Sequence, residues 1–137
     1  MLQKLQTRRG GFTLVEIMIV VAIIALLAAI AVPNFLRARK RSQATRVLED
    51  LRLIDAAVDQ YAIEANLVGG AVVPWTKIQG YLKVGSKLYN SNHTDLLGGD
   101  YGANQTVDVL PGVAAATFTA LSDVAPADFW SPFRILP

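Results

Sequence analysis

The chain lacks cysteine altogether and has one histidine, His93, among 137 residues. Without cysteine it forms neither a disulfide nor a thiolate metal site. No serine has a recognisable base partner, so the sequence offers no arrangement for nucleophilic catalysis. A lone histidine in a loop is far more often solvent-facing than catalytic. The sequence therefore predicts that the protein is not an enzyme.

Charge is missing from one long stretch of the chain. Residues 17–32 contain no polar side chain, and the apolar segment as a whole covers residues 12–32. An α-helix of that length spans about 31 Å, which matches a hydrocarbon core of about 30 Å. After residue 34 the composition is that of a small water-soluble domain. The sequence thus predicts a membrane-length helix joined to a soluble head.

Three interpretations of this N-terminal region are open on composition alone. It is a transmembrane anchor, a secretory signal peptide cleaved near Ala29 or Ala31, or a short leader followed by a helix that the mature protein keeps. Basic residues flank both ends of the apolar segment, so the positive-inside rule leaves its orientation ambiguous. Glu16 separates the three, because an ionised carboxylate in hydrocarbon is costly unless it finds a partner. A plain anchor or signal peptide gains nothing from a carboxylate there.

The segment GGFTLVEIMIVVAIIALLAAIAVPNF, residues 10–35, resembles the class III leader and N-terminal helix of type IV pilins and type II secretion pseudopilins. The resemblance implies that a prepilin peptidase cuts between Gly11 and Phe12 and N-methylates Phe12. It also implies that the helix forms the core of a helical filament. Pro33 either ends the transmembrane helix or kinks it, and a kink is expected because helical patterning resumes beyond it. Cleavage creates a cationic amine on Phe12. The carboxylate of Glu16, one helical turn along, is then expected to pair with the amine of a neighbouring subunit.

The function that this resemblance implies is structural. The protein would be a subunit of a type IV pilus-like filament or a type II secretion pseudopilus, assembled by an inner-membrane platform and its ATPase. It would start as a single-pass protein of the bacterial inner membrane with its head in the periplasm, and end in a periplasmic pseudopilus or a cell-surface pilus. The lack of cysteine favours a pseudopilin, since many type IV pilins close a C-terminal loop with a disulfide. The alternative is a membrane-anchored or secreted periplasmic binding domain with no filament role.

These observations divide the chain into four parts. They are a cleavable leader (1–11), a transmembrane and filament-core helix (12–33), an amphipathic helix that continues the rod (34–68), and a small β-rich head (69–137). Apolar residues in the third part recur at intervals of four and three, which places them on one helical stripe: Val47, Leu51, Ile54, Val58, Tyr61 and Ala65. The opposite face carries charge at Glu49, Arg52, Asp59 and Glu64. Gly69 and Gly70 are expected to end the helix.

The head is punctuated by glycine and proline and contains short apolar runs. Residues 74–83 predict a turn and a short helix, and residues 105–110 alternate as a strand does. Residues 115–121 are a second strand candidate, although their alanines also permit a helix. The last 13 residues are expected to fold back as an irregular clasp. The predicted fold class is α+β, the pilin fold, with a long helix packed on a small antiparallel sheet.

Two clusters in the sequence raise the question of ligands. Asp95, Asp100, Asn104 and Asp108 lie in a glycine-rich loop and offer oxygen ligands of the kind that calcium prefers. Their spacing is not that of an EF-hand, and aspartate and asparagine also form turns beside glycine. The basic run at residues 37–41 favours contact with membrane lipids before assembly, or with acidic neighbours in a filament. Nucleic acid is unlikely as a direct ligand, because no aromatic residues interleave these charges.

Overall fold

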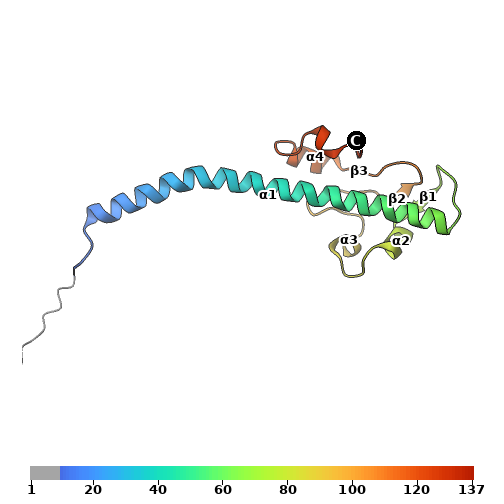
Figure 1. The fold of residues 1–137 in the computed structure, drawn as a ribbon, viewed down its shortest axis with the longest axis horizontal. Helices are drawn as coiled ribbons and strands as arrows, with labels where there is room; N and C mark the ends of the chain where they lie inside the picture. The colour runs from blue at the N-terminus through green and yellow to red at the C-terminus, as the bar shows by residue number, and fades with distance from the viewer. Residues whose placement is uncertain (1–9) are drawn as a thin grey trace, which may run out of the picture. The chain divides into compact units, whose positions relative to one another are not determined.

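A computed structural model describes residues 10–137. The chain divides into two compact units, Met1–Leu36 and Arg37–Pro137. One helix, α1 (Leu14–Glu64), begins in the N-terminal unit and ends in the C-terminal unit. It is the element at the start of the coloured ribbon in Figure 1. All other helices and strands within the described residues belong to the C-terminal unit.

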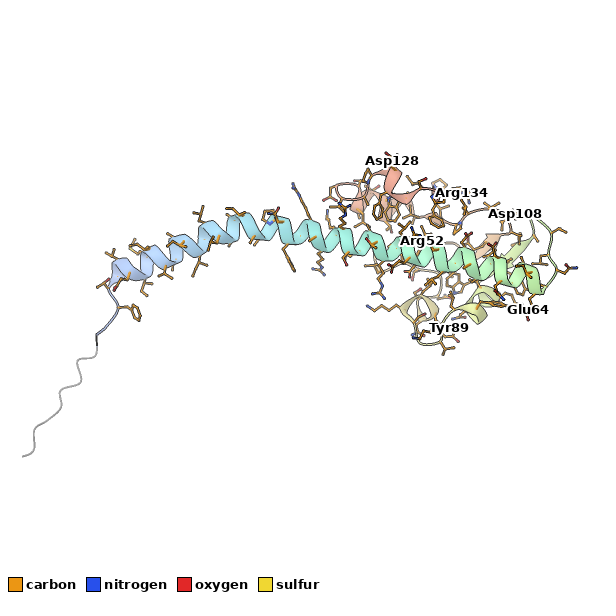
Figure 2. All side chains as sticks on the ribbon, viewed as in Figure 1. Arg52, Glu64, Tyr89, Asp108, Asp128 and Arg134 are labelled. Carbon is orange, nitrogen blue, oxygen red and sulfur yellow. The ribbon has the colours of Figure 1, made fainter. Side chains whose placement is uncertain are left out.

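The N-terminal part of α1 exposes its apolar side chains on every side (Figure 2). The helix is long and apolar enough to cross a membrane, and none of the residues in its apolar window is buried. Helical structure continues through Pro33. Because proline has no N–H group, the carbonyl of Ala29 lacks the helical donor it would otherwise have. A kink at Pro33 stays a prediction.

The C-terminal part of α1 is amphipathic, as the sequence predicts. Val47, Leu51, Ile54 and Val58 are buried, Tyr61 is half-buried, and Ala65 follows the end of the helix and is exposed. The stripe is wider than the predicted one, since it also buries Ala44, Leu48, Ala57 and Ala62. The helix ends at Glu64, ahead of the glycine pair expected to stop it. The left-handed conformation that follows belongs to Asn66, with φ of 53°.

Short elements follow α1 in the C-terminal unit. In chain order they are β1 (Val72–Pro74), α2 (Trp75–Ile78), η1 (Gln79–Tyr81), α3 (Lys87–Asn90), β2 (Asn104–Thr106), β3 (Gly112–Val113), α4 (Ala115–Leu121), η2 (Ala127–Trp130) and β4 (Arg134–Ile135). Strands β1 and β2 pair antiparallel, with Val73 opposite Gln105. Strands β3 and β4 pair parallel, with Gly112 opposite Arg134. This confirms the α+β class and the helix expected at residues 74–83.

The structure corrects two details of the predicted head. Residues 115–121 form helix α4 and not a strand, because burial of Thr117 and Leu121, four residues apart, follows the helical period. The strand expected at residues 105–110 ends at Thr106, since the chain turns through Asp108, which has φ of 64°. The small antiparallel sheet is present as β1 and β2, and a second two-stranded sheet, β3 and β4, is parallel.

The core of the C-terminal unit lies against the buried stripe of α1. Its largest fully buried side chains include Trp130, Tyr101, Leu51 and Ile54. The indole N–H of Trp130 donates to the carbonyl of Ala125 at 3.1 Å, which satisfies the buried donor. In Figure 1, α2 and α3 lie on one side of this part of α1 and α4 lies on the other. The helix therefore has two flanks, and each is covered by a different segment of the chain.

Candidate functional site

The start of α1 is closed by a reciprocal contact between Thr13 and Glu16. Thr13 is the N-cap residue, since its carbonyl accepts the first helical bond from the N–H of Ile17 at 3.3 Å. Its hydroxyl accepts from the N–H of Glu16 at 3.2 Å. In return, Oε2 of Glu16 accepts from the N–H and from the hydroxyl of Thr13, each at 2.7 Å. This is a capping box, which satisfies two of the donors that a helix leaves unpaired at its N-terminus.

The capping box also explains how the chain tolerates Glu16 next to an apolar run. A carboxylate is favoured at a helix N-terminus by the helix dipole as well as by the exposed N–H groups. Both hydrogen bonds to the carboxylate go to Oε2. Among the residues that the structure describes, Oε1 has no hydrogen-bond partner. One oxygen of Glu16 thus holds the helix start, and the other is available to a donor from elsewhere.

The bond between Gly11 and Phe12 lies outside the helix. Both residues are exposed, and α1 begins two residues after Phe12. The Phe12 side chain is 84% exposed. The peptide bond between Gly11 and Phe12 is therefore exposed and non-helical. Most of the predicted leader, with Arg8 and Arg9, lies outside the described residues, so its structure adds nothing to the prediction.

The four calcium candidates do not converge on one point. The carboxylate of Asp95 is buried and accepts from the N–H groups of Leu97 and Gly99 and from the hydroxyl of Thr117. Asn104 is exposed on β2, and Asp108 lies in a turn beside Gly69. Within residues 10–137, no group of three or more His, Cys, Asp or Glu side chains is gathered as for a metal ion. The structure therefore gives Asp95 the role of holding its own loop.

Asp100, the fourth candidate, is bound to the only histidine. Nδ1 of His93 lies 2.7 Å from Oδ1 of Asp100, which also accepts from the N–H of Gly102 at 2.6 Å. These bonds, the one from Gly102 first, lower the pKa of the Asp100 carboxyl below its usual value. His93 was expected to face solvent, but it is half-buried beside Trp75, with the ring centroids 5.9 Å apart. Both residues therefore take part in contacts that hold this loop.

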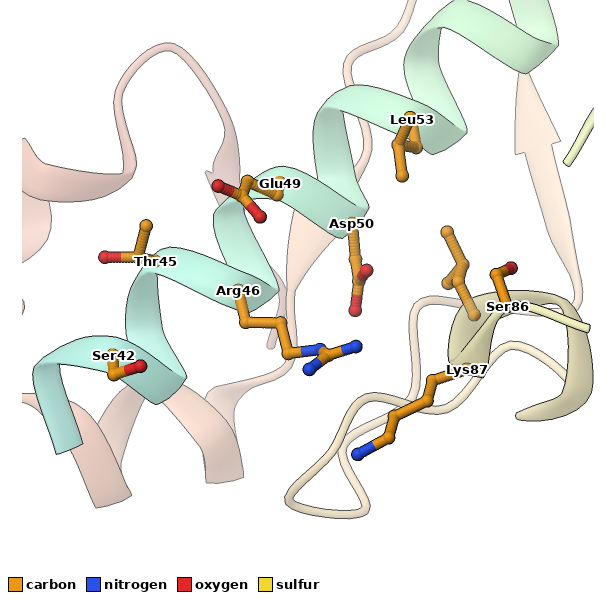
Figure 3. A pocket seen from close by; sticks show the side chains of 9 residues that line it. Ser42, Thr45, Arg46, Glu49, Asp50, Leu53, Ser86 and Lys87 are labelled. Carbon is orange, nitrogen blue, oxygen red and sulfur yellow. The ribbon is translucent and has the colours of Figure 1, made fainter. Parts of the chain in front are cut away.

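The sequence does not predict a groove that lies on one flank of α1. The groove has a volume of about 550 Å³ and lies between α1 and α3. Arg46 and Asp50 of α1 and Lys87 of α3 point toward this hollow (Figure 3). The hydroxyl of Tyr101 donates to Asp50 at 3.2 Å. Partial burial nevertheless raises the pKa of the Asp50 carboxyl. Asp50 lies three residues after Val47 and four before Ile54, so it falls within the apolar stripe. A carboxylate at that spacing is the signal in the sequence that marks Asp50 as a partly buried residue.

Comparison with known proteins bears on the N-terminal half of the chain. The family model described as "Prokaryotic N-terminal methylation motif" matches residues 6–32. This match includes the exposed peptide at Gly11 and Phe12 and the capping box of Thr13 and Glu16. No solved structure matches the chain.

Three curated relatives illustrate the similarity. The chain is 38% identical over 72 residues to the type IV major fimbrial protein FimA of Dichelobacter nodosus, covering 53% of this chain and 46% of that protein. It is 44% identical over 71 residues to the type IV major pilin protein PilA of Myxococcus xanthus, covering 47% and 32%. It is 37% identical over 57 residues to the type II secretion system core protein G of Klebsiella pneumoniae, covering 42% and 41%. The chain thus spans less than half the length of each of these relatives.

Proposed function

We propose that the chain belongs, through its N-terminal half, to the family of type IV pilins and type II secretion pseudopilins and that it works as a filament subunit. The observation that carries this proposal is the methylation motif at residues 6–32, together with the capping box inside it. The role is structural and not enzymatic: α1 supplies the core of the filament and the C-terminal unit supplies its surface.

The first step is maturation by a prepilin peptidase. Cleavage between Gly11 and Phe12 removes the basic leader and leaves a cationic amine on Phe12, and methylation of that amine keeps its charge. The exposed, non-helical peptide at this point supports the step. The apolar part of α1 holds the precursor in the inner membrane, with the C-terminal unit in the periplasm. Lipids surround this part of the helix until the assembly platform and its ATPase take the subunit up.

The second step is recognition of the next subunit by Glu16. In the membrane a lone amine and a lone carboxylate each carry a desolvation cost, which falls when the two pair. The capping box supports this role, because it fixes the carboxylate through Oε2 and leaves Oε1 for the amine of a neighbour. A subunit that docks in a wrong position leaves both charges unpaired, which is unfavourable. The pair therefore sets the register between subunits more than it adds to their affinity.

Replacement of Glu16 tests the assembly step. We expect Glu16→Ala to insert in the membrane and to be cleaved like the wild type, but to yield few or no filaments in the fraction sheared from cells or from the periplasm. Glu16→Asp, which keeps the charge on a shorter side chain, is the matched control and should retain more assembly. Wild-type filament yield from Glu16→Ala would contradict the proposed role. Filaments of either kind, pilus or pseudopilus, agree with it.

A further inference from the structure

The basic run at residues 37–41 has no role in the proposed assembly steps. It lies on α1, within the C-terminal unit, and the chain has no acidic residue anywhere in residues 17–48. The sequence leaves two kinds of partner open for this run, membrane lipids and acidic neighbours in a filament. Its four cations are Arg37, Arg39, Lys40 and Arg41, which we call the basic collar.

The basic collar surrounds the helix and does not form a single face of it. Successive side chains of an α-helix are rotated by about 100°, so Arg39 points about 200° away from Arg37 and Lys40 about 300° away. Arg41 returns to within about 40° of Arg37. A folded protein or a nucleic-acid duplex lies against one side of a helix, whereas a bilayer surrounds a crossing helix on every side. A ring of cations therefore matches a membrane surface.

One member of the collar is paired, and the three arginines are not. Nζ of Lys40 lies 3.0 Å from each carboxylate oxygen of Asp123, two residues after α4. The three arginines are exposed, and their side chains form no ion pair or hydrogen bond within residues 10–137. The segment of Asp123 carries one further carboxylate, Asp128 on η2. Even when both carboxylates are counted against the four cations, the collar keeps an excess of two positive charges.

This excess of positive charge does not extend along the rest of α1. Arg46 precedes Glu49 and Asp50 by three and four residues, a spacing at which opposite charges attract. Arg52 lies three residues after Glu49 and three before Asp55. The later cations of the helix are thus interspersed with carboxylates. Along α1, cations gather without acidic neighbours on the helix only in the collar.

The collar also follows the apolar segment at the spacing of the lipid headgroups. The headgroup layer adds roughly 5–7 Å on each side of the hydrocarbon core, which is about four or five residues of helix. Arg37 comes five residues after Val32, the last residue of the apolar segment. The aliphatic stem of arginine can lie against lipid chains while its guanidinium reaches the phosphate layer. The guanidinium also binds phosphate oxygens through two parallel hydrogen bonds.

We propose that the basic collar binds the phosphate headgroups of anionic phospholipids in the membrane that α1 crosses. The inference rests on the proposed function, from which it takes the membrane-spanning role of the apolar part of α1. It names the partner of the C-terminal unit before assembly. A subunit leaves these lipids when the assembly platform takes it up, so the collar holds unassembled subunits at the membrane surface.

Energy transfer from the labelled full-length chain to labelled lipid tests this contact. The chain contains no cysteine, so Ser42→Cys, at the exposed position after the collar, provides a single site for the donor. The protein is reconstituted into phosphatidylcholine vesicles with a trace of acceptor on the acyl chain of either phosphatidylglycerol or phosphatidylcholine. We expect transfer to phosphatidylglycerol to exceed transfer to phosphatidylcholine by about threefold, and high salt to bring the two towards equality.

Two triple variants, both made in the labelled chain, separate the collar from net charge. The first combines Arg37→Gln, Arg39→Gln and Arg41→Gln. It keeps the ion pair of Lys40 with Asp123, and should bring the two transfers to equality. The second variant, matched in charge, removes three exposed cations elsewhere in the C-terminal unit and should keep the wild-type ratio. It combines Lys77→Gln, Lys83→Gln and Lys87→Gln.

The outcomes separate the inference from the proposed function. Equal transfer to the two lipids in the wild type, or the wild-type ratio in the arginine variant, overturns the inference and leaves the filament role standing. Equal transfer together with binding of a DNA duplex that the arginine variant loses assigns the collar to nucleic acid instead. A chain that does not float with the vesicles overturns the membrane role of α1 and the inference together. Absence of filaments in cells, with the expected lipid ratio, overturns the filament role and leaves the lipid contact standing.

Discussion

Oε2 of Glu16 lies 2.7 Å from the backbone nitrogen and 2.7 Å from the hydroxyl oxygen of Thr13. These two hydrogen bonds serve two purposes. They complete the hydrogen bonds at the start of α1, and they fix the position of a carboxylate that is otherwise costly beside an apolar segment. The other carboxylate oxygen has no hydrogen-bond partner within residues 10–137. If Glu16 takes the proposed role in assembly, Thr13 is the residue that positions it.

The first prediction concerns Thr13. Thr13→Val removes the hydroxyl that Glu16 uses as donor and as acceptor, and should weaken the helix start by about 1 kcal/mol. Glu16 is then less well positioned, so the filament yield should fall without loss of membrane insertion. Thr13→Ser keeps the hydroxyl and should assemble normally. Equal yields from the valine and serine variants, measured in sheared filament fractions, would show that the hydroxyl is not needed.

A second prediction concerns the core of the C-terminal unit. Leu51 is fully buried on α1, and Leu51→Ala leaves a cavity that should cost about 2–5 kcal/mol in the free energy of unfolding. Leu53, two residues on, is 53% exposed. Leu53→Ala should change stability by no more than about 0.5 kcal/mol. Thermal unfolding of the two full-length variants in detergent compares them, and equal losses would show that the stripe is placed incorrectly.

The third prediction is a pH dependence at Asp50. Burial raises the pKa of the Asp50 carboxyl, so the folded state holds this proton more tightly than the unfolded state does. Ionisation of Asp50 therefore costs stability as the pH rises through its folded pKa, and costs nothing below the unfolded value of about 3.9. Asp50→Asn, which still accepts from Tyr101, should be more stable than the wild type at pH 7.

Melting curves at two pH values check this sign. The gain from Asp50→Asn should largely disappear when the pH is brought to about 3, where the wild-type carboxyl is mostly protonated in both states. Glu49→Gln, at the exposed neighbouring position, is the control and should show little gain at either pH. A stabilisation by Asp50→Asn that is as large at low pH as at pH 7 would assign the effect to packing and not to charge.

A fourth prediction concerns calcium. Both carboxylate oxygens of Asp95 already take part in hydrogen bonds, with Leu97, Gly99 and Thr117. One oxygen of Asp100 does so with His93 and Gly102. We therefore expect the melting temperature to be the same with added calcium and with a chelator. A rise of several degrees with calcium that a chelator reverses would restore the metal hypothesis for this loop.

The sequence predicts the helical half of this protein better than the rest, and the reason is physical. A long apolar run and a stripe at helical spacing are repeated signals, so Val47, Leu51, Ile54 and Val58 were identified as buried from their spacing alone. The segment of residues 115–121 carries one short, ambiguous signal. Its alanines suit a helix, and contact of Thr117 and Leu121 with the core decides the matter, which no local pattern contains.

The candidate site also has residues that the sequence predicts and residues that only the structure identifies. The motif points to Gly11, Phe12 and Glu16, but the role of Thr13 appears only when the hydrogen bonds are seen. The groove between α1 and α3 could not be predicted from local patterns, because Arg46 and Lys87 are far apart in sequence and come together only through the packing of α3 on α1. Composition groups the loop aspartates as calcium candidates, but the directions of their side chains depend on backbone turns such as the one at Asp108.

Mass spectrometry of the N-terminus of the mature protein bears most directly on the filament role. A subunit matured as proposed begins at Phe12, carries a methyl group on its α-amine, and has lost residues 1–11. The same measurement detects an N-terminus near Ala31, which is where a signal peptidase would cut instead. A mature N-terminus near Ala31, or a chain that keeps Met1 in cells that possess a prepilin peptidase, would contradict the filament role.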